Sequence, residues 1–132
     1  MTGRKYLLDT NIIIYFLQGY EEVEPIFTRL EKGEVQGKIS IITVIEVLAF
    51  PGLSDQKQQD VEVFIRNFEV VPLTDTIVKQ TIRIRKQYKI KLPDAIIAAT
   101  AQEEHAILAT RNTKDFEHIA DLEIKNPFDS SG

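Results

Sequence analysis

The sequence predicts an α/β protein with a central, mainly parallel sheet. Short apolar runs alternate with helical stretches from one end of the chain to the other, which is typical of βαβ units. The runs at residues 6–8 and 106–109 have no polar side chains, as expected for strands covered on both faces. No internal repeat or low-complexity linker divides the 132 residues. We therefore expect a single domain over residues 1–132.

The boundaries of the expected elements come from local signals. Thr43 is the expected N-cap of the third helix, which places Glu46 in its first turn. Pro93 suits the first position of a later helix, with Asp94 in the same turn. Residues 127–132 are expected to fray. The expected strands are 6–8, 37–41, 69–73, 106–109 and a short edge strand at 122–124. The expected helices are 12–17, 21–32, 44–50, 54–67, one from Thr74 or Asp75 to 88, and 93–104.

Composition excludes several classes of protein. The chain has no cysteine, so a disulfide framework, a thiolate metal site and a cysteine nucleophile are excluded. The N-terminus lacks the pattern of a signal peptide, and no apolar run reaches the roughly 18–20 residues that cross a bilayer. We therefore expect a cytoplasmic protein with no membrane association. The net charge of −4 argues weakly against nucleic-acid binding.

Three acids stand inside apolar runs. Asp9 is the only charged residue in 6–17, Glu46 is the only one in 39–50, and Asp94 precedes the uncharged residues 95–101. Carboxylates are rarely buried unless they are paired or bind a metal. None of the three has a basic neighbour in its own run. We therefore expect the three acids to converge on one divalent cation.

The predicted topology supports this convergence. Asp9 follows the first strand, and Asp115 follows the fourth. Ligands of parallel sheets bind at the carboxyl ends of the strands. Oxygen ligands without His or Cys select Mg²⁺ or Mn²⁺, whose natural anionic partner is a phosphate. Because no GxxxxGK[ST] or GxGxxG pattern occurs, metal-assisted phosphodiester hydrolysis is the reaction class that the residues favour.

A basic strip leads to Asp94. Residues 76–93 contain no acid but six Lys or Arg residues. Lys79, Arg83 and Lys86 fall on one helix face and are candidates for contact with nucleic-acid phosphates. The alternative is a solvated helix face, which is the commoner role of a charge run.

The chain resembles the PIN-domain ribonucleases, and among them the VapC-type toxins of bacterial toxin–antitoxin pairs. Four segments carry the resemblance: LLDTNIIIY, TVIEVL, LPDAIIAATA and LATRNTKDF. The resemblance implies a three-layer α/β/α fold with about five strands, and RNA cleavage with Mg²⁺ or Mn²⁺. It also implies a homodimer and a cognate antitoxin that blocks the site.

The resemblance also implies roles for particular residues. Asp9, Glu46, Asp94 and Asp115 are the expected metal ligands and catalytic acids. Asn112 stands where many relatives have an acid, so Asp115 or Asn112 completes the site. Thr10, Asn11, Thr110 and Asn112 are the expected hydrogen-bonding partners of these acids. For each acid, the structural alternative is the capping of a helix or turn.

Two other functions remain open at this stage. A catalytically silent PIN-like module that binds RNA or a protein is the main alternative, because Asn112 departs from the family pattern. A phosphatase of the haloacid-dehalogenase type is more distant, because Asn11 stands where its DxD pattern requires a second acid.

Overall fold

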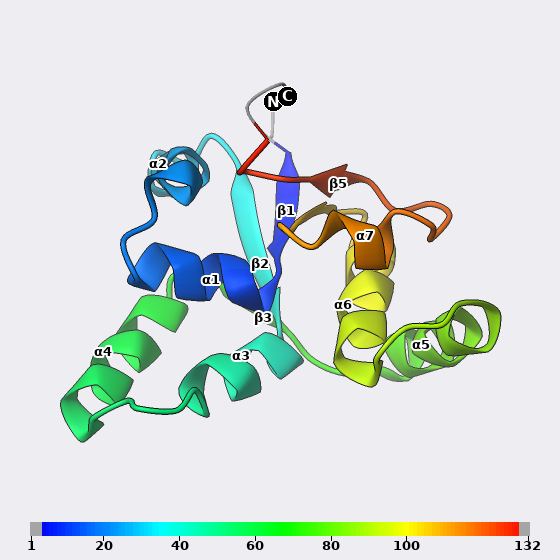
Figure 1. Ribbon diagram of the computed structural model, residues 1–132, viewed down its shortest axis with the longest axis horizontal. Coiled ribbons are helices and arrows are strands. Elements are labelled where there is room, and N and C mark those ends of the chain that lie inside the picture. The colour runs from blue at the N-terminus through cyan, green and yellow to red at the C-terminus, as the bar shows by residue number, and fades with distance from the viewer. Residues whose placement is uncertain (1–3, 130–132) are drawn as a thin grey trace.

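A computed structural model describes residues 4–129. Its centre is a five-stranded sheet in the order β3-β2-β1-β4-β5, in which every neighbouring pair is parallel (Figure 1). The predicted α/β class with a five-stranded parallel sheet is therefore confirmed. The strands are β1 (Lys5–Leu8), β2 (Gln36–Ser40), β3 (Glu69–Val71), β4 (Ile107–Ala109) and β5 (Ile124–Lys125).

Helices cover both faces of the sheet, which gives the three predicted layers. One core cluster packs α1, α2 and α4 against the sheet, and the other packs α5, α6 and α7 against the opposite face. The helical segments are α1 (Thr10–Leu17), η1 (Glu21–Val23), α2 (Glu24–Glu31), α3 (Ile41–Leu48), α4 (Asp55–Ile65), α5 (Asp75–Gln87), α6 (Leu92–Glu103) and α7 (Thr113–Phe116).

The central strand β1 belongs to both cores. Tyr6 and Leu8 lie in the α1 cluster, whereas Leu7 lies in the α6 cluster, because successive side chains of a strand point to opposite faces. The backbone N–H of Asp9 donates to the carbonyl of Ala109 over 3.0 Å and extends the pairing of β1 with β4. All carboxyl ends of the parallel strands therefore meet at one edge of the sheet.

The start of α3 differs from the prediction. Ser40, not Thr43, is the N-cap, and its side chain accepts a hydrogen bond from the N–H of Ile42 over 3.1 Å. Glu46 consequently lies in the second turn of α3. The apolar run around Ser40 fits a strand or a buried helix equally well, so periodicity could not place this boundary.

Other parts of the chain also differ from the prediction, among them the edge strand, which is Ile124–Lys125 and not 122–124, and the short helix α7, which was not predicted. The second helical stretch begins as the 3₁₀ segment η1, and Pro93 takes the second rather than the first position of α6. Phe128 was expected in a frayed end, but it packs against the α1 core cluster. Residues 130–132 of that predicted end lie outside the described part of the chain.

Candidate carboxylate site at the sheet edge

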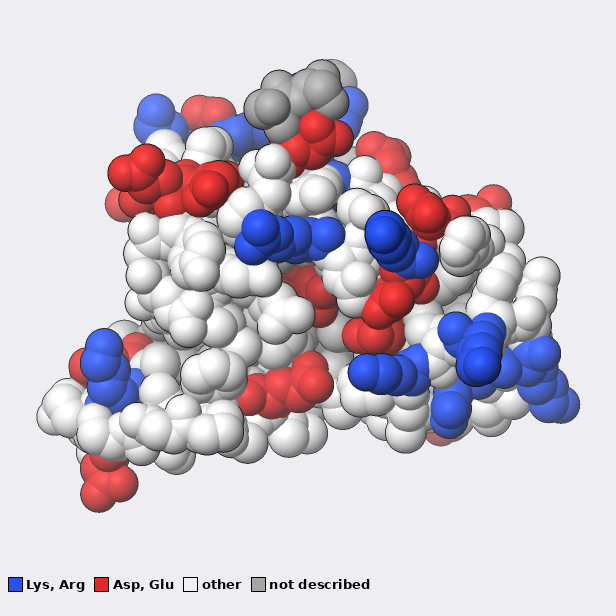
Figure 2. Space-filling model, viewed as in Figure 1, with Lys and Arg blue, Asp and Glu red and all other residues white. Residues whose placement is uncertain are grey.

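Four acids come from four elements that meet at the carboxyl edge. Asp9 directly follows β1 and caps α1 in an extended conformation. Glu46 lies on α3, Asp94 in the first turn of α6, and Asp115 on α7. Figure 2 shows acidic side chains gathered in the middle of the face that carries this edge, with basic side chains beside them.

Asp9 is the most buried of the four acids, with 5% of its surface exposed. Its Oδ2 accepts a hydrogen bond from the hydroxyl of Thr110 over 2.8 Å. Burial and the negative charges of Asp94 and Glu46 together raise the pKa of the Asp9 carboxyl to about 6, although its hydrogen bonds oppose the shift. Asp9 is therefore a buried acid with a raised pKa, and within residues 4–129 it has no basic partner.

Asp94 experiences the same environment from α6. Burial raises the pKa of its carboxyl, as do the charges of Asp115 and Glu46, while Lys91 opposes the shift. Within residues 4–129 its carboxylate accepts no hydrogen bond. Each of the four acids thus acts electrostatically on at least one other, so the fold brings Asp9, Glu46, Asp94 and Asp115 together.

Hydrogen-bond donors orient three of these carboxylates. The hydroxyl of Thr10 donates to Oε1 of Glu46 over 2.6 Å and pairs with the buried Thr43 hydroxyl at 3.1 Å. Thr10 contacts Glu46 directly, and Thr43 contacts Thr10. Because both threonines are uncharged, they orient Glu46 without neutralising its charge. Sequence reasoning missed Thr43 as a site residue because it assigned Thr43 to a helix cap.

A second chain of hydrogen bonds links two acids through the segment after β4. The side-chain amide of Asn112 donates to Asp115, and the backbone N–H of Asn112 donates to the Thr110 hydroxyl over 3.0 Å. Thr110 in turn donates to Asp9. Asn11 is exposed, and within the described chain its side chain makes no hydrogen bond.

The donor set suits a hard divalent cation. It contains carboxylate and hydroxyl oxygens, and no nitrogen or sulfur ligand contributes. Over residues 4–129, however, no three Asp, Glu, His or Cys side chains are arranged to hold a metal as they stand. Three of the four carboxylates instead accept hydrogen bonds from their neighbours, so metal binding would require their side chains to reorient.

The predicted basic residues lie farther along the same face. Lys79, Arg83 and Lys86 are exposed on α5, where Figure 2 shows basic side chains gathered at one end of the molecule. Arg83 donates to the side chain of Gln80 over 3.2 Å. Lys91, which begins α6, is the basic residue that lowers the pKa of Asp94. His105 and His118 are exposed.

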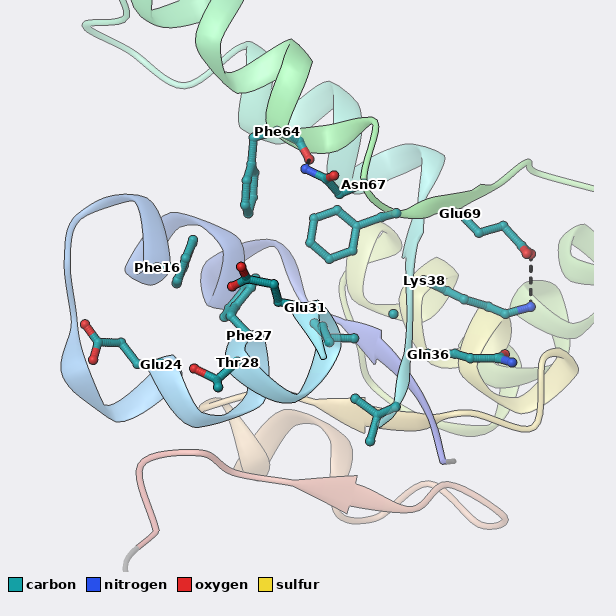
Figure 3. A pocket seen from close by; sticks show the side chains of 14 residues that line it. Phe16, Glu24, Phe27, Thr28, Glu31, Gln36, Lys38, Phe64, Asn67 and Glu69 are labelled. Atoms are coloured by element: carbon teal, nitrogen blue, oxygen red, sulfur yellow. Dashed lines mark hydrogen bonds and ion pairs between the residues drawn. The ribbon is translucent and has the colours of Figure 1, made fainter. Parts of the chain in front are cut away.

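A groove of about 820 Å³ lies away from the carboxylates, between α1, α2, α4 and the strands β2 and β3 (Figure 3). None of the four acids lines it. Its lining includes the rings of Phe16, Phe27, Phe64 and Phe68, of which Phe16 is stacked on Phe27 and Phe64, while Phe68 meets Phe64 edge to face. It also includes the exposed acids Glu24, Glu31 and Glu69, and Lys38, which pairs with Glu69 over 2.9 Å. The rings therefore make part of the groove apolar, and Glu24 and Glu31 are acids that form no ion pair within residues 4–129.

No helix in residues 4–129 has the length and apolar character to cross a membrane.

Comparison with known proteins identifies the family to which this chain belongs. Residues 6–122 match the model of the PIN domain. The chain is similar to Ribonuclease VapC1 of Methanocaldococcus jannaschii, with 33% identity over 92% of this chain and 85% of that protein. The chain therefore belongs to the PIN-domain family and, within it, to the VapC group.

Solved structures agree with this assignment. A toxin–antitoxin complex from Klebsiella pneumoniae contains a chain with a TM-score of 0.80 and 35% identity, covering 94% of this chain and 98% of that one. VapBC-1 from nontypeable Haemophilus influenzae gives a TM-score of 0.79 and 27% identity, covering 95% and 99%. These similarities cover nearly the whole of each chain.

Proposed function

We propose that this chain is an endoribonuclease that depends on Mg²⁺ or Mn²⁺ and is the toxin of a cytoplasmic toxin–antitoxin pair. The observation that carries the proposal is the buried Asp9 carboxyl, whose pKa is raised to about 6 beside two further acids. A cluster of like charges without a basic partner costs stability and is typical of functional sites. The ribonuclease names of similar VapC proteins point to RNA as the substrate.

The residues of the edge have separable roles in this proposal. Asp9, Glu46, Asp94 and Asp115 would hold the cation. A bound Mg²⁺ or Mn²⁺ would lower the pKa of water and stabilise charge on the phosphodiester. Thr110 and Thr10 fix the orientations of Asp9 and Glu46 through hydrogen bonds of 2.8 and 2.6 Å, as is usual for groups that support metal ligands.

The basic face of α5 would bind RNA phosphates outside the cluster. Lys79, Arg83 and Lys86 are all exposed, and none is held in an ion pair within residues 4–129. Contacts with phosphates make binding weaker as salt concentration rises. A solvated helix face would leave the salt dependence unchanged when these residues are replaced.

RNA cleavage by the purified, antitoxin-free chain tests the proposal. We expect cleavage with Mg²⁺ or Mn²⁺, none with EDTA, and a loss of about 100-fold or more for Asp94→Asn because the substitution removes a charge with little change in shape. Asp60→Asn, which makes the same change on exposed α4, is the matched control. Absence of cleavage by the unmodified chain under all metal conditions would refute the enzymatic proposal.

Calorimetry distinguishes the enzyme from the silent binding module. We expect the unmodified chain to bind Mn²⁺ and Asp94→Asn to bind it at least about tenfold more weakly, since one ligand is lost. RNA binding that persists without any binding of divalent cations at millimolar concentration would favour the silent module.

The groove of Figure 3 is the surface that we assign to the antitoxin. Its rings suit apolar anchors, and its exposed acids suit a basic segment of the partner. The probe is the protein encoded beside this chain, co-expressed with it and tested by co-purification. We expect Phe64→Glu or Glu31→Lys to reduce retention at least about tenfold, whereas Val63→Glu, on an exposed position of the same helix, should not.

The proposal includes a homodimer. Exposed apolar side chains on α3, α5 and α6 are available for such an interface, among them Ile45, Ile82 and Leu92. Light scattering should give twice the chain mass, and a monomer at micromolar concentration would contradict this part of the proposal.

A further inference from the structure

Arg111 is held in an unusual way beside the carboxylate edge. Its guanidinium lies 4.0 Å from the ring centroid of Phe128 and 5.4 Å from that of Tyr15. Tyr15 also contacts Tyr20 and Phe128, with ring centroids 4.8 and 5.1 Å apart. Three aromatic rings therefore form a wall on which one cation rests, an interaction in which the ring face attracts the positive charge.

The position of Arg111 is fixed by its neighbours in the chain. Thr110 donates to Asp9, and Asn112 donates to Asp115. Consecutive Cα atoms lie about 3.8 Å apart, so the backbone of Arg111 is adjacent to two residues that orient the acids. The backbone N–H of Thr110 donates to the carbonyl of Lys125 over 3.0 Å, which ties this segment to the end of β5 and hence to Phe128.

The guanidinium has no acidic partner despite these neighbours. Within residues 4–129, Arg111 forms no ion pair with a carboxylate and no hydrogen bond through its side chain. Arg111 is exposed, so the aromatic wall holds a guanidinium whose five N–H donors make no hydrogen bond within the described residues. A planar fork of donors matches the geometry of a phosphate, and Arg binds such groups in a bidentate manner.

The chemistry of the edge explains what such a group would do. Four acids repel an approaching polyanion, and the whole chain has a net charge of −4. A pre-oriented cation at the rim attracts a phosphate without neutralising the acids. Because its ring contacts already restrict the side chain, binding costs less conformational entropy than it would for a free arginine.

We propose that Arg111, held by Phe128 and Tyr15, binds an RNA phosphate next to the one that reaches the carboxylates. The inference rests on the proposed RNA substrate. Arg111 is then a positioning residue, and Phe128 acts through it. The structural alternative is that Arg111, Tyr15 and Phe128 only stabilise the packing of the segment around Phe128.

The first test measures binding without catalysis. A fluorescently labelled single-stranded RNA of mixed sequence is titrated in EDTA over about 50–200 mM salt. We expect Arg111→Gln to weaken binding about tenfold and to reduce the slope of log K against log salt by about 0.7, the loss of one phosphate contact on a single strand. Arg111→Lys should keep the slope but bind more weakly, because it keeps charge without the planar fork.

Matched controls separate a local contact from a general loss of charge. Arg66→Gln makes the same change just after α4, at an exposed position away from the aromatic wall. We expect it to leave both affinity and slope unchanged. An equal effect of Arg66→Gln, or an unchanged slope for Arg111→Gln, would overturn the proposal.

A double-mutant cycle tests the aromatic wall. Phe128→Leu should weaken binding about threefold, and adding it to Arg111→Gln should cause no further loss, because the ring acts through the arginine. Independent effects of the two changes would contradict this coupling. Melting temperatures measured in parallel identify a purely structural role, in which stability falls and RNA affinity does not.

Kinetics with Mg²⁺ give the final discrimination. For Arg111→Gln we expect KM to rise about tenfold and kcat to change less than about threefold, as for a group that binds without taking part in the chemistry. If the chain binds RNA through Arg111 but never cleaves it, the ribonuclease proposal fails and this one stands. If it cleaves RNA and Arg111→Gln has no effect on slope or KM, only this one fails.

Discussion

The two sides of the sheet are packed from different side chains. On one side α6 contributes Ala95, Ala98, Ala99 and Ala101, all fully buried. On the other side the rings of Phe16, Phe27, Phe64 and Phe68 pack against one another, stacked, tilted or edge to face, with centroids 4.0–6.3 Å apart. Small side chains let a helix backbone approach the sheet closely, whereas large rings leave gaps at their edges.

This difference corresponds to two kinds of surface. The alanine side holds Asp94 on a tightly packed helix, which suits a site that must keep its geometry. The phenylalanine side leaves the groove of Figure 3 open, which suits the docking of another chain. Residue size on the two faces of one sheet can therefore separate a fixed site from an adaptable surface.

The largest expected effect concerns the electrostatic cost of keeping Asp9 ionised at the carboxylate edge. The pKa of Asp9 is raised to about 6 in the folded state, so the folded protein binds this proton more tightly than the unfolded chain. The contribution of Asp9 to stability is therefore greatest at low pH and is lost as pH rises from about 4 to about 6, by about 2–3 kcal/mol. Asp9→Asn should abolish this fall.

Urea unfolding in EDTA from pH 4 to 7 measures this effect as the difference between the unmodified chain and Asp9→Asn. Asp60→Asn on the opposite side should leave the pH dependence unchanged. If the difference in unfolding free energy between the two proteins does not change with pH over this range, the carboxylate edge does not raise the pKa of Asp9.

The second prediction concerns packing on the alanine side. Ala98→Leu should lower the free energy of unfolding by about 1–3 kcal/mol, because added methyl groups cannot fit between a closely packed helix and the sheet. It should also reduce RNA cleavage, since α6 carries Asp94. Ala49→Leu, at an exposed position after α3, is the control and should change stability by less than about 0.5 kcal/mol. Equal losses of unfolding free energy in the two variants would contradict the close packing of α6 against the sheet.

The smallest expected effect lies on the phenylalanine side. A Cβ added at Gly37 in β2 would approach Cδ2 of Leu30 to 2.6 Å and Cδ1 of Phe68 to 3.2 Å. The closer atom, Cδ2 of Leu30, is the end of a flexible side chain, and both Leu30 and Phe68 line an open groove into which they can shift. Gly37→Ala should therefore cost less than about 1 kcal/mol in chemical denaturation. A loss as large as that of Ala98→Leu would show that this side is equally rigid.

The sequence predicted the sheet and the gathering of the four acids because both depend on local patterns. Asp9, Glu46 and Asp94 each interrupt an apolar run, and parallel strands bring their ends to one edge. The cap of α3 was misplaced, because Ser40 lies in a run that suits a strand or a buried helix.

The role of Phe128 could not be predicted from the sequence. A single aromatic residue after Pro127 is typical of a frayed terminal segment, and its partners Arg111 and Tyr15 are distant in sequence. No periodic pattern connects three residues that meet only after β1, β4 and β5 are assembled. Ring contacts of this kind become visible only in three dimensions.

The hydrogen bond from Thr110 to Asp9 joins residues that are 101 positions apart. A growing polypeptide therefore has its first acid exposed long before the residue that orients it exists. At about 5–20 residues per second, synthesis separates the two by roughly 5–20 seconds. The nascent chain consequently cannot complete its carboxylate edge on the ribosome until Thr110 has been made.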